Sequence, residues 1–151
     1  MDTKQQKIIN SAIKDLLEQL GIEASFTVEE QEDALNIFLE TQDTGIVIGY
    51  HGEVLEALQL ILSLAISKKL GHFLRVTLEV GDYRKNRTGW LESVAASAKE
   101  KALAEQQEIT LPNLKAWERR IVHMLFQDDK EVVSESVGEG RERTLVIKPR
   151  T

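Results

Sequence analysis

The stretch "IVIGYHGEVLEALQ", residues 46–59, places Gly49 and Gly52 three positions apart, immediately before a run with helical character. Glycine weakens the start of a helix unless the backbone needs a positive φ or a close approach. A turn that enters a helix exposes unpaired N–H groups at the positive end of the helix dipole, where a phosphate binds readily. Taken alone, the spacing is explained more readily by a tight turn than by a phosphate site.

The segments around this loop change that balance. Hydrophobic periodicity predicts a helix over residues 3–20, a hairpin of strands 24–30 and 34–40, a short segment 43–49, a helix 53–69 and a strand 73–80. A G-x-x-G loop between a short and a longer helix, with strands on both sides, is the arrangement that clamps about four nucleotides in one RNA-binding module. The helix 53–69 has only a narrow polar stripe, so we expect it to be buried on most sides. Leu60 and Leu64 would then be covered by a second helix or by a partner chain.

The rest of the chain predicts a second α/β unit. Its pattern favours a helix 83–106, a short strand 108–111, a helix 113–126, and strands 131–138 and 143–149. Residues 1–80 carry 6 Lys and Arg against 13 Asp and Glu, whereas residues 81–151 carry 13 against 12. This difference in charge, with Gly81 between the halves, predicts domains at 1–80 and 81–151.

A candidate binding surface lies in "LKAWERRIVHMLF", residues 114–126. At about 100° per residue, Arg119 and His123 share one face of the helix. The opposite, core face would hold Leu114, Trp117, Ile121, Met124 and Leu125. We therefore expect His123 to point outward and, with Arg119, to bind phosphate or a base. Arg120 either extends this patch or is simply solvated, and Arg84 and Arg87, three residues apart on the preceding helix, are further candidates.

Both halves resemble parts of one bacterial family. Residues 1–80 resemble a type II KH domain of order αββααβ, and "GIVIGYHGEVLEALQ" is close to the loop of the Jag family, also called KhpB or SpoIIIJ-associated. In residues 81–151, "ERRIVHMLFQDD" and "TLVIKPR" resemble that family's R-3-H domain, of order αβαββ and named for an Arg and a His separated by three residues. The family's N-terminal Jag domain has no counterpart in this sequence, so its functions are not carried over.

The resemblance implies binding of single-stranded nucleic acid by both domains, RNA before DNA, in a regulator of RNA-chaperone type. In the KH loop, Gly49, Tyr50, His51 and Gly52 would contact phosphates, with an apolar groove beside the next helix for bases. The middle positions of such loops are often basic, so here the backbone, a hydroxyl or a partly protonated imidazole must supply the attraction. The family also implies a KH partner, such as KhpA or a second copy, and a link to the YidC membrane insertase. The alternative function is therefore a protein-interaction adaptor that binds nucleic acid weakly.

Other classes of function find no support in the sequence. It has no cysteine, no G-x-x-x-x-G-K-[ST] loop and no H-E-x-x-H motif, and its three histidines lack metal-ligand spacing. We therefore expect neither an enzyme nor a bound metal or cofactor. The N-terminus lacks the apolar stretch of a signal peptide, and the longest apolar run, residues 60–66, is too short to span a bilayer. These features predict a cytoplasmic protein that is not embedded in a membrane.

Overall fold

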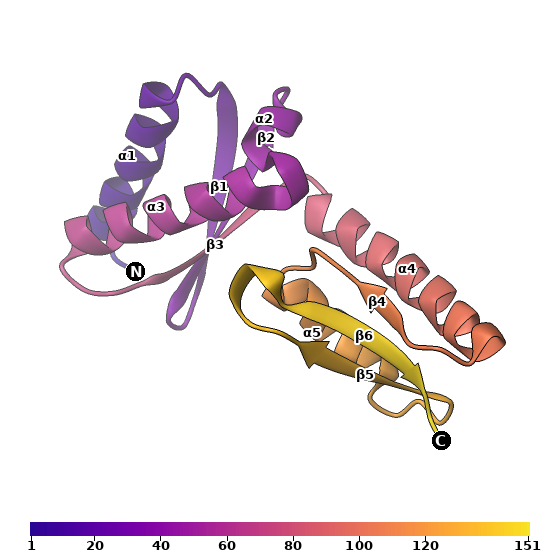
Figure 1. The fold of residues 1–151 in the computed structure, drawn as a ribbon. Helices are drawn as coiled ribbons and strands as arrows, with labels where there is room; N and C mark the ends of the chain where they lie inside the picture. The colour runs from indigo at the N-terminus through magenta and orange to yellow at the C-terminus, as the bar shows by residue number, and fades with distance from the viewer. The chain divides into compact units, whose positions relative to one another are not determined.

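The computed structural model describes residues 1–151 and divides between Tyr83 and Arg84 into two units, each with a hydrophobic core of its own (Figure 1). Both units combine helices with a three-stranded sheet, which confirms the predicted α/β class. The sequence alone placed the boundary at residue 81.

The first unit has the element order helix, strand, strand, helix, helix, strand. Its elements are α1 (Thr3–Gln19), β1 (Ala24–Gln31), β2 (Ala34–Thr41), α2 (Thr44–Ile48), a 3-10 turn (Tyr50–Gly52), α3 (Glu53–Leu70) and β3 (Arg75–Val80). The strand order is β1-β2-β3, with β1 antiparallel and β3 parallel to β2. The parallel pair needs a crossover connection, and α2, the turn and α3 provide it.

One face of this sheet carries the core. Alternate residues of each strand point to this face. Phe26 of β1 lies beside Leu39 of β2, and Ile37 of β2 lies beside Leu78 of β3. Helix α1 adds Ile9 and Ile13, and α3 adds further buried leucines to the same cluster. Helix α1 begins after its N-cap residue Asp2, whose carboxylate accepts a 2.7 Å hydrogen bond from the Gln5 backbone N–H.

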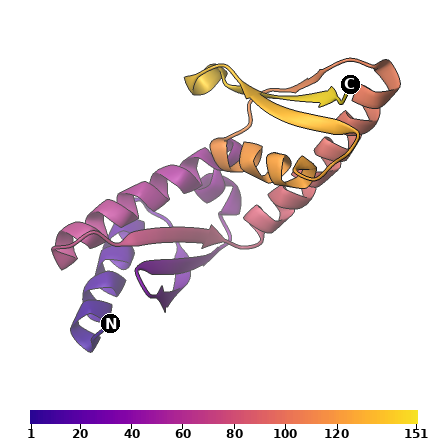
Figure 2. The same cartoon turned by 90° about the horizontal axis from the view of Figure 1, so that it is seen from below.

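The orientation of α3 corrects the prediction that this helix is buried on most sides. Three residues of its polar stripe, Gln59, Ser63 and Ser67, face β3 and its approach instead of water, and Figure 2 shows the strand running alongside the helix. Gln59 accepts a 3.0 Å hydrogen bond from the Leu78 N–H, and Ser67 accepts one of 3.0 Å from Leu74. Because β3 is an edge strand, backbone groups of β3 and of the residues just before it have no neighbouring strand on one side. Gln59 and Ser67 provide the hydrogen-bond partners that these groups need. Leu60 and Leu64 therefore lie 60% and 61% exposed, covered by no second helix.

By length and composition, the segment Thr44–Leu70 is apolar enough to cross a membrane. It is, however, broken at residues 49–52, where Gly49, His51 and Gly52 have positive φ. The continuous part, α3, packs Leu55, Leu58, Leu62 and Ile66 into the core, as a helix of a folded domain does.

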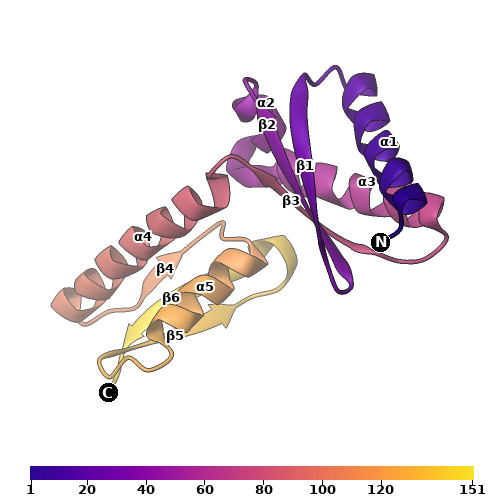
Figure 3. The same cartoon turned by 180° about the vertical axis from the view of Figure 1, so that it is seen from behind.

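The second unit is built from α4 (Tyr83–Glu105), β4 (Ile109–Leu111), α5 (Ala116–Phe126), β5 (Val132–Val137), a 3-10 turn (Gly140–Glu142) and β6 (Thr144–Pro149). Its sheet has the order β4-β6-β5 and is antiparallel throughout. Helix α5 contacts β5, as Figure 3 shows. Alanines 95, 98 and 102 of α4 are buried in the core with Leu145 and Ile147 of β6.

The core of the second unit also holds a charge pair. The Glu118 side chain is fully buried, and Arg87 Nε donates to its Oε1 at 2.6 Å. Its other oxygen, Oε2, accepts a 2.9 Å hydrogen bond from the backbone N–H of Lys115, the N-cap residue of α5. The Arg87 guanidinium also lies 4.0 Å from the ring centroid of Trp90. The pair thus ties α4 to the first turn of α5.

Candidate nucleic-acid interface

The G-x-x-G loop takes a conformation that requires both glycines. Gly49 has φ 69° and ψ −172°, a region open essentially only to glycine, and a Cβ there would lie 2.9 Å from the Val54 Cβ. Gly52 has φ 77°, and its Cβ would lie 3.0 Å from the Tyr83 ring. The turn therefore needs these glycines whether or not a ligand approaches it.

The residues between the glycines expose aromatic surface at the loop. The Tyr50 side chain is 73% exposed, and its ring centroid lies 4.0 Å from that of His51. Gly52 is the N-cap of α3 and has no side chain to cap the helix, while Glu53 and Glu56 place negative charge in the first turn. The loop offers flat rings and a helix N-terminus, in an acidic setting that opposes phosphate.

The structure corrects the predicted faces of α5. The residues buried in the core are Glu118, Val122 and Phe126, whereas Met124 and Leu125 are 65% and 44% exposed. Trp117 and Ile121 pack only at the edge of the core. The prediction failed because it followed hydrophobicity, and the buried face begins in the first turn of the helix with the charged Glu118.

The surface beside α5 is a hollow with a volume of about 490 Å³, which we call the arginine hollow. Its charged lining consists of Arg119, Arg120, Arg143 and Arg150, and no carboxylate lines it. The other lining residues are His123, Met124, Phe126, Gln127, Val133, Ser134 and Ser136. A concentration of cations without counter-charges attracts anions, and guanidinium groups match phosphate oxygens in geometry.

His123 stands against β5 instead of pointing outward, which corrects that expectation. Its Nδ1 lies 2.6 Å from Ser134 Oγ, and its Nε2 lies 2.9 Å from Ser136 Oγ. Burial lowers the pKa of His123 below its ordinary value of 6.5, and Arg143 and Arg119 lower it further. The ring is therefore held mainly in its neutral form at neutral pH.

Two of the arginines are also anchored to the backbone. Arg119 Nη1 donates to the Leu114 carbonyl at 2.6 Å, before the start of α5. Arg150 Nε donates to the carbonyls of Asp129 at 2.9 Å and Val132 at 3.1 Å. Such hydrogen bonds fix the guanidinium groups at the rim of the hollow and reduce the conformational entropy lost when a ligand binds.

Of the residues proposed from sequence, Arg119, Arg120 and His123 line one hollow, and Arg84 and Arg87 do not line it. Sequence reasoning missed Arg143, Arg150, Ser134 and Ser136. The available signal was in β5, where Val132, Ser134 and Ser136 share a face that starts apolar and becomes polar. The arginines gave no comparable signal because they lie at the two ends of β6.

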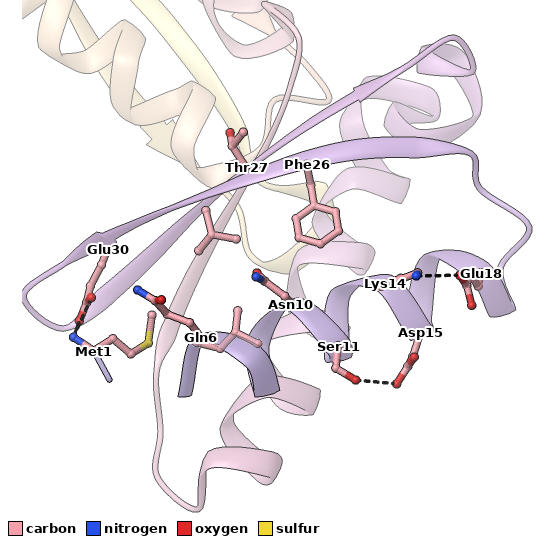
Figure 4. Close-up of a pocket in the computed structure, with 12 residues that line it drawn as sticks. Met1, Gln6, Asn10, Ser11, Lys14, Asp15, Glu18, Phe26, Thr27 and Glu30 are labelled. Atoms are coloured by element: carbon pink, nitrogen blue, oxygen red, sulfur yellow. Dashed lines mark hydrogen bonds and ion pairs between the residues drawn. The ribbon is translucent and has the colours of Figure 1, made fainter. Parts of the chain in front are cut away.

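A larger hollow, of about 970 Å³, lies between α1 and β1 of the first unit (Figure 4). Its charged groups are paired, the N-terminal amine with Glu30, Lys14 with Glu18, and Asp15 with Lys69, which lies outside the hollow. Phe26 projects into it from β1. Three carboxylates, Asp15, Glu18 and Glu30, line it and make it a poor site for phosphate. No group of three or more His, Asp or Glu side chains is arranged to hold a metal ion.

Comparison with known proteins agrees with the two units. Residues 6–80 match the model of the KhpA/KhpB KH domain, and residues 89–149 match that of the R-3-H domain. The RNA-binding protein KhpB of Clostridium symbiosum is 31% identical over 150 residues, covering 95% of this chain and 68% of that protein. The chain belongs to the KhpB family. The first unit accordingly contains its KH domain and the second its R-3-H domain.

The other relatives are more distant or longer. The RNA-binding protein KhpB of Bacillus subtilis is 26% identical over 137 residues, covering 89% of this chain and 66% of that protein. That of Streptococcus pneumoniae is 27% identical over 135 residues, and the match covers 89% of this chain but only 41% of that protein.

Proposed function

We propose that this KhpB-family chain binds single-stranded RNA, as the names of its relatives state RNA binding for them, and serves as a regulator of RNA-chaperone type. The observation that carries the proposal is the arginine hollow, with four arginines and no carboxylate in a chain of net charge −6. In an acidic protein, such a local excess of cations needs a reason, and a phosphate backbone supplies one. Binding without catalysis accounts for these residues, so no enzymatic role is proposed.

The KH loop has the second, weaker role in this proposal. Its backbone turn at Gly49 and Gly52 approaches phosphate closely, and the exposed Tyr50 ring stacks on a base. Because Glu53 and Glu56 oppose a phosphate there, most of the electrostatic affinity comes from the R-3-H domain. Arg120 lines the hollow and joins Arg119 as a phosphate contact, whereas Arg87 is assigned to the buried pair with Glu118.

Fluorescence polarisation with short single-stranded RNA and DNA at several salt concentrations tests this proposal. We expect RNA binding to weaken as salt rises, because phosphate contacts release counterions. Replacing Arg119 by alanine should lower affinity by about tenfold and reduce the salt slope by about one. Arg141→Ala is the matched control, because Arg141 is exposed in the same domain and does not line the hollow. Loss of binding when Tyr50 and His51 are both replaced by Asp would support a role for the KH loop, and absence of RNA binding at low salt would refute the proposal.

The exposed face of α3 favours a second candidate function, in protein interaction. Leu60, Ile61 and Leu64 are 60%, 46% and 61% exposed, and contiguous apolar surface marks interaction sites. A KH partner, KhpA-like or a second copy of this chain, would cover that face, and the link to a membrane insertase remains a prediction. Light scattering on the purified protein tests whether a second copy of this chain covers that face. A concentration-dependent dimer that Leu60→Gln with Leu64→Gln converts to monomer supports the interaction, whereas a monomer at all concentrations removes the homodimer. We propose a cytoplasmic location, where RNA ligands are found.

A further inference from the structure

Both ring nitrogens of His123 are already engaged inside the protein. Nδ1 lies 2.6 Å from Ser134 Oγ and Nε2 lies 2.9 Å from Ser136 Oγ. An imidazole has no other hydrogen-bonding atom, so the ring has nothing left to offer a ligand while these contacts persist. Each serine hydroxyl, in contrast, keeps further capacity, since it has one hydrogen and two lone pairs. Both serines line the arginine hollow.

We propose that Ser134 and Ser136 donate the hydrogen bonds that hold a phosphate in the arginine hollow, and that His123 is a positioning residue that directs their hydrogens. This inference rests on the proposed function and names its contacts. The phosphate takes charge from Arg119 and Arg143 at the rim of the hollow and accepts O–H hydrogens from β5 at its wall.

The protonation state of His123 decides how many serine hydroxyl hydrogens are left for a ligand. A neutral imidazole has one N–H and one bare nitrogen. The bare nitrogen accepts the hydrogen of one serine, and the N–H donates to the oxygen of the other, which leaves only one hydroxyl hydrogen for a ligand. An imidazolium ring donates at both nitrogens and releases both hydroxyl hydrogens. A phosphate that accepts from both serines therefore binds best when His123 is protonated.

Because of the charges around the ring, binding of an anion and protonation of His123 are linked equilibria. The groups facing the hollow are Arg119 and Arg120 from α5, Arg143 before β6 and Arg150 after it, with no carboxylate among them. In the free protein they oppose a charged ring, in line with the lowered pKa of His123. A bound anion reverses that field, so the pKa of His123 is higher in the complex. Affinity should rise as pH falls through the higher pKa and level off below the lower one.

Polarisation with labelled single-stranded RNA tests the roles of the side chains in the whole chain. Ser134→Ala with Ser136→Ala should weaken binding by about tenfold or more at pH 6, because each lost charge-assisted hydrogen bond is worth a severalfold change. Thr at both positions keeps the hydroxyls and should restore affinity. Ser97→Ala is the matched control, since Ser97 is exposed in the same domain and does not line the hollow.

The pH profile separates positioning from direct contact. Wild type should bind RNA more tightly at pH 5.5 than at pH 7.5, by about tenfold for each unit by which the ligand raises the pKa of His123. The double alanine variant should lose most of this dependence although it retains His123, because only the field of the bound anion still couples the ring to the ligand. His72→Gln, which alters an exposed loop histidine, should keep the full dependence. If the double variant keeps the full dependence, His123 contacts the ligand directly and the inference is wrong.

Sulfate, whose charge is constant over this range, gives a test independent of RNA. NMR titration of the His123 ring should show its pKa rising when sulfate is added, and this rise should be much smaller in the double alanine variant at the same sulfate concentration. A rise without any RNA binding would retain the anion site while rejecting the proposed function. An unchanged pKa of His123 with both sulfate and RNA would overturn the inference, including where RNA binds elsewhere on the chain.

Discussion

The G-x-x-G loop and the arginine hollow are candidate phosphate sites made in opposite ways. The loop is a single continuous segment whose shape depends on the backbone angles of Gly49 and Gly52. The hollow gathers side chains from α5, β5 and both ends of β6, and the backbone there is ordinary. A backbone site is easily recognised in a sequence, yet its glycines serve the turn first. A side-chain site is hidden in sequence, yet its arginines are harder to explain without a ligand.

The two sites also rest on different supports. Behind the loop lies an aliphatic core to which α3 contributes four buried side chains. Behind the hollow, α5 is held by the buried Glu118 and its partner Arg87. Charged supports fail abruptly when one partner is removed, whereas aliphatic cores lose stability in proportion to the volume lost. The R-3-H domain should therefore be the more sensitive of the two to a single substitution.

The largest effect is expected from Arg87→Met, which leaves the Glu118 carboxylate buried beside an apolar chain. Breaking a buried pair in this way costs about 3 to 5 kcal/mol of unfolding free energy. Urea unfolding, followed by NMR signals from each domain, should show the R-3-H domain unfolding first. The double variant Arg87→Met with Glu118→Met should recover most of the loss, because no charge is left unpaired. Equal stability of the single variant and wild type would show that the pair does not support α5.

The next effect concerns the loop, where Gly49→Ala forces a Cβ against Val54 at a positive φ. Strain of this kind costs about 1 to 3 kcal/mol. The matched control is Gly45→Ala in α2, where a Cβ meets nothing within 4 Å and φ is not positive, so that variant should be neutral or slightly more stable. Thermal unfolding of both variants without ligand measures the difference. If Gly49→Ala is as stable as wild type, the glycine serves ligand approach alone.

A third prediction compares the two sites through affinity. Arg143→Ala should weaken RNA binding by about tenfold, the loss expected for one good phosphate contact. Tyr50→Ala should cost less, about fivefold, the lower end of the effect of losing one base–aromatic stack, because the ring is exposed. Polarisation at one salt concentration ranks the variants, with Arg141→Ala as the control for net charge. A larger loss of RNA affinity in Tyr50→Ala than in Arg143→Ala would show that the main binding site is the KH loop.

Much of the fold could be predicted from the sequence because its signals are local. Helical and alternating periodicities located every helix and strand to within a few residues, and the polar turn between residues 31 and 34 indicated the hairpin. The orientation of α3 could not be predicted in this way. Its serines and Gln59 satisfy backbone groups at and before β3, a demand that arises only when the sheet exists.

The residues of the candidate site also fall into those that local sequence patterns identify and those that only packing brings together. Arg119 and His123 were identified because one turn of a helix brings residues four apart together. Ser134 and Ser136 lie on a strand 11 and 13 residues beyond His123, and only the packing of α5 on β5 joins them to it. Glu118 was missed because a charged residue on a buried face contradicts the pattern that defines such a face.

The smallest effect concerns the start of β5, the strand that lines one side of the arginine hollow. Asp129 Oδ1 accepts hydrogen bonds from the N–H groups of Glu131 at 2.8 Å and Val132 at 3.0 Å, and its Oδ2 lies 2.6 Å from Lys99 Nζ. The Lys99 ammonium, and then the two N–H groups, lower the pKa of Asp129 to about 2 from an ordinary 3.8. The stability that follows is present above about pH 4 and disappears as pH falls toward 2.

Asp129→Asn should therefore lower the unfolding temperature by about 4 to 8 °C at neutral pH. The gap to wild type should narrow below about pH 4 and close as pH falls through about 2, where protonation gives the native side chain the same charge as its replacement. Calorimetry across this range measures the gap, and Asp128→Asn, at an exposed neighbouring position, is the control. RNA affinity should fall only slightly, because Arg150 still donates to the unchanged carbonyl of residue 129. A large loss of affinity with an intact melting transition would mean that this carboxylate, rather than the arginines, orders the hollow, and the contrast between loop and hollow would need to be redrawn.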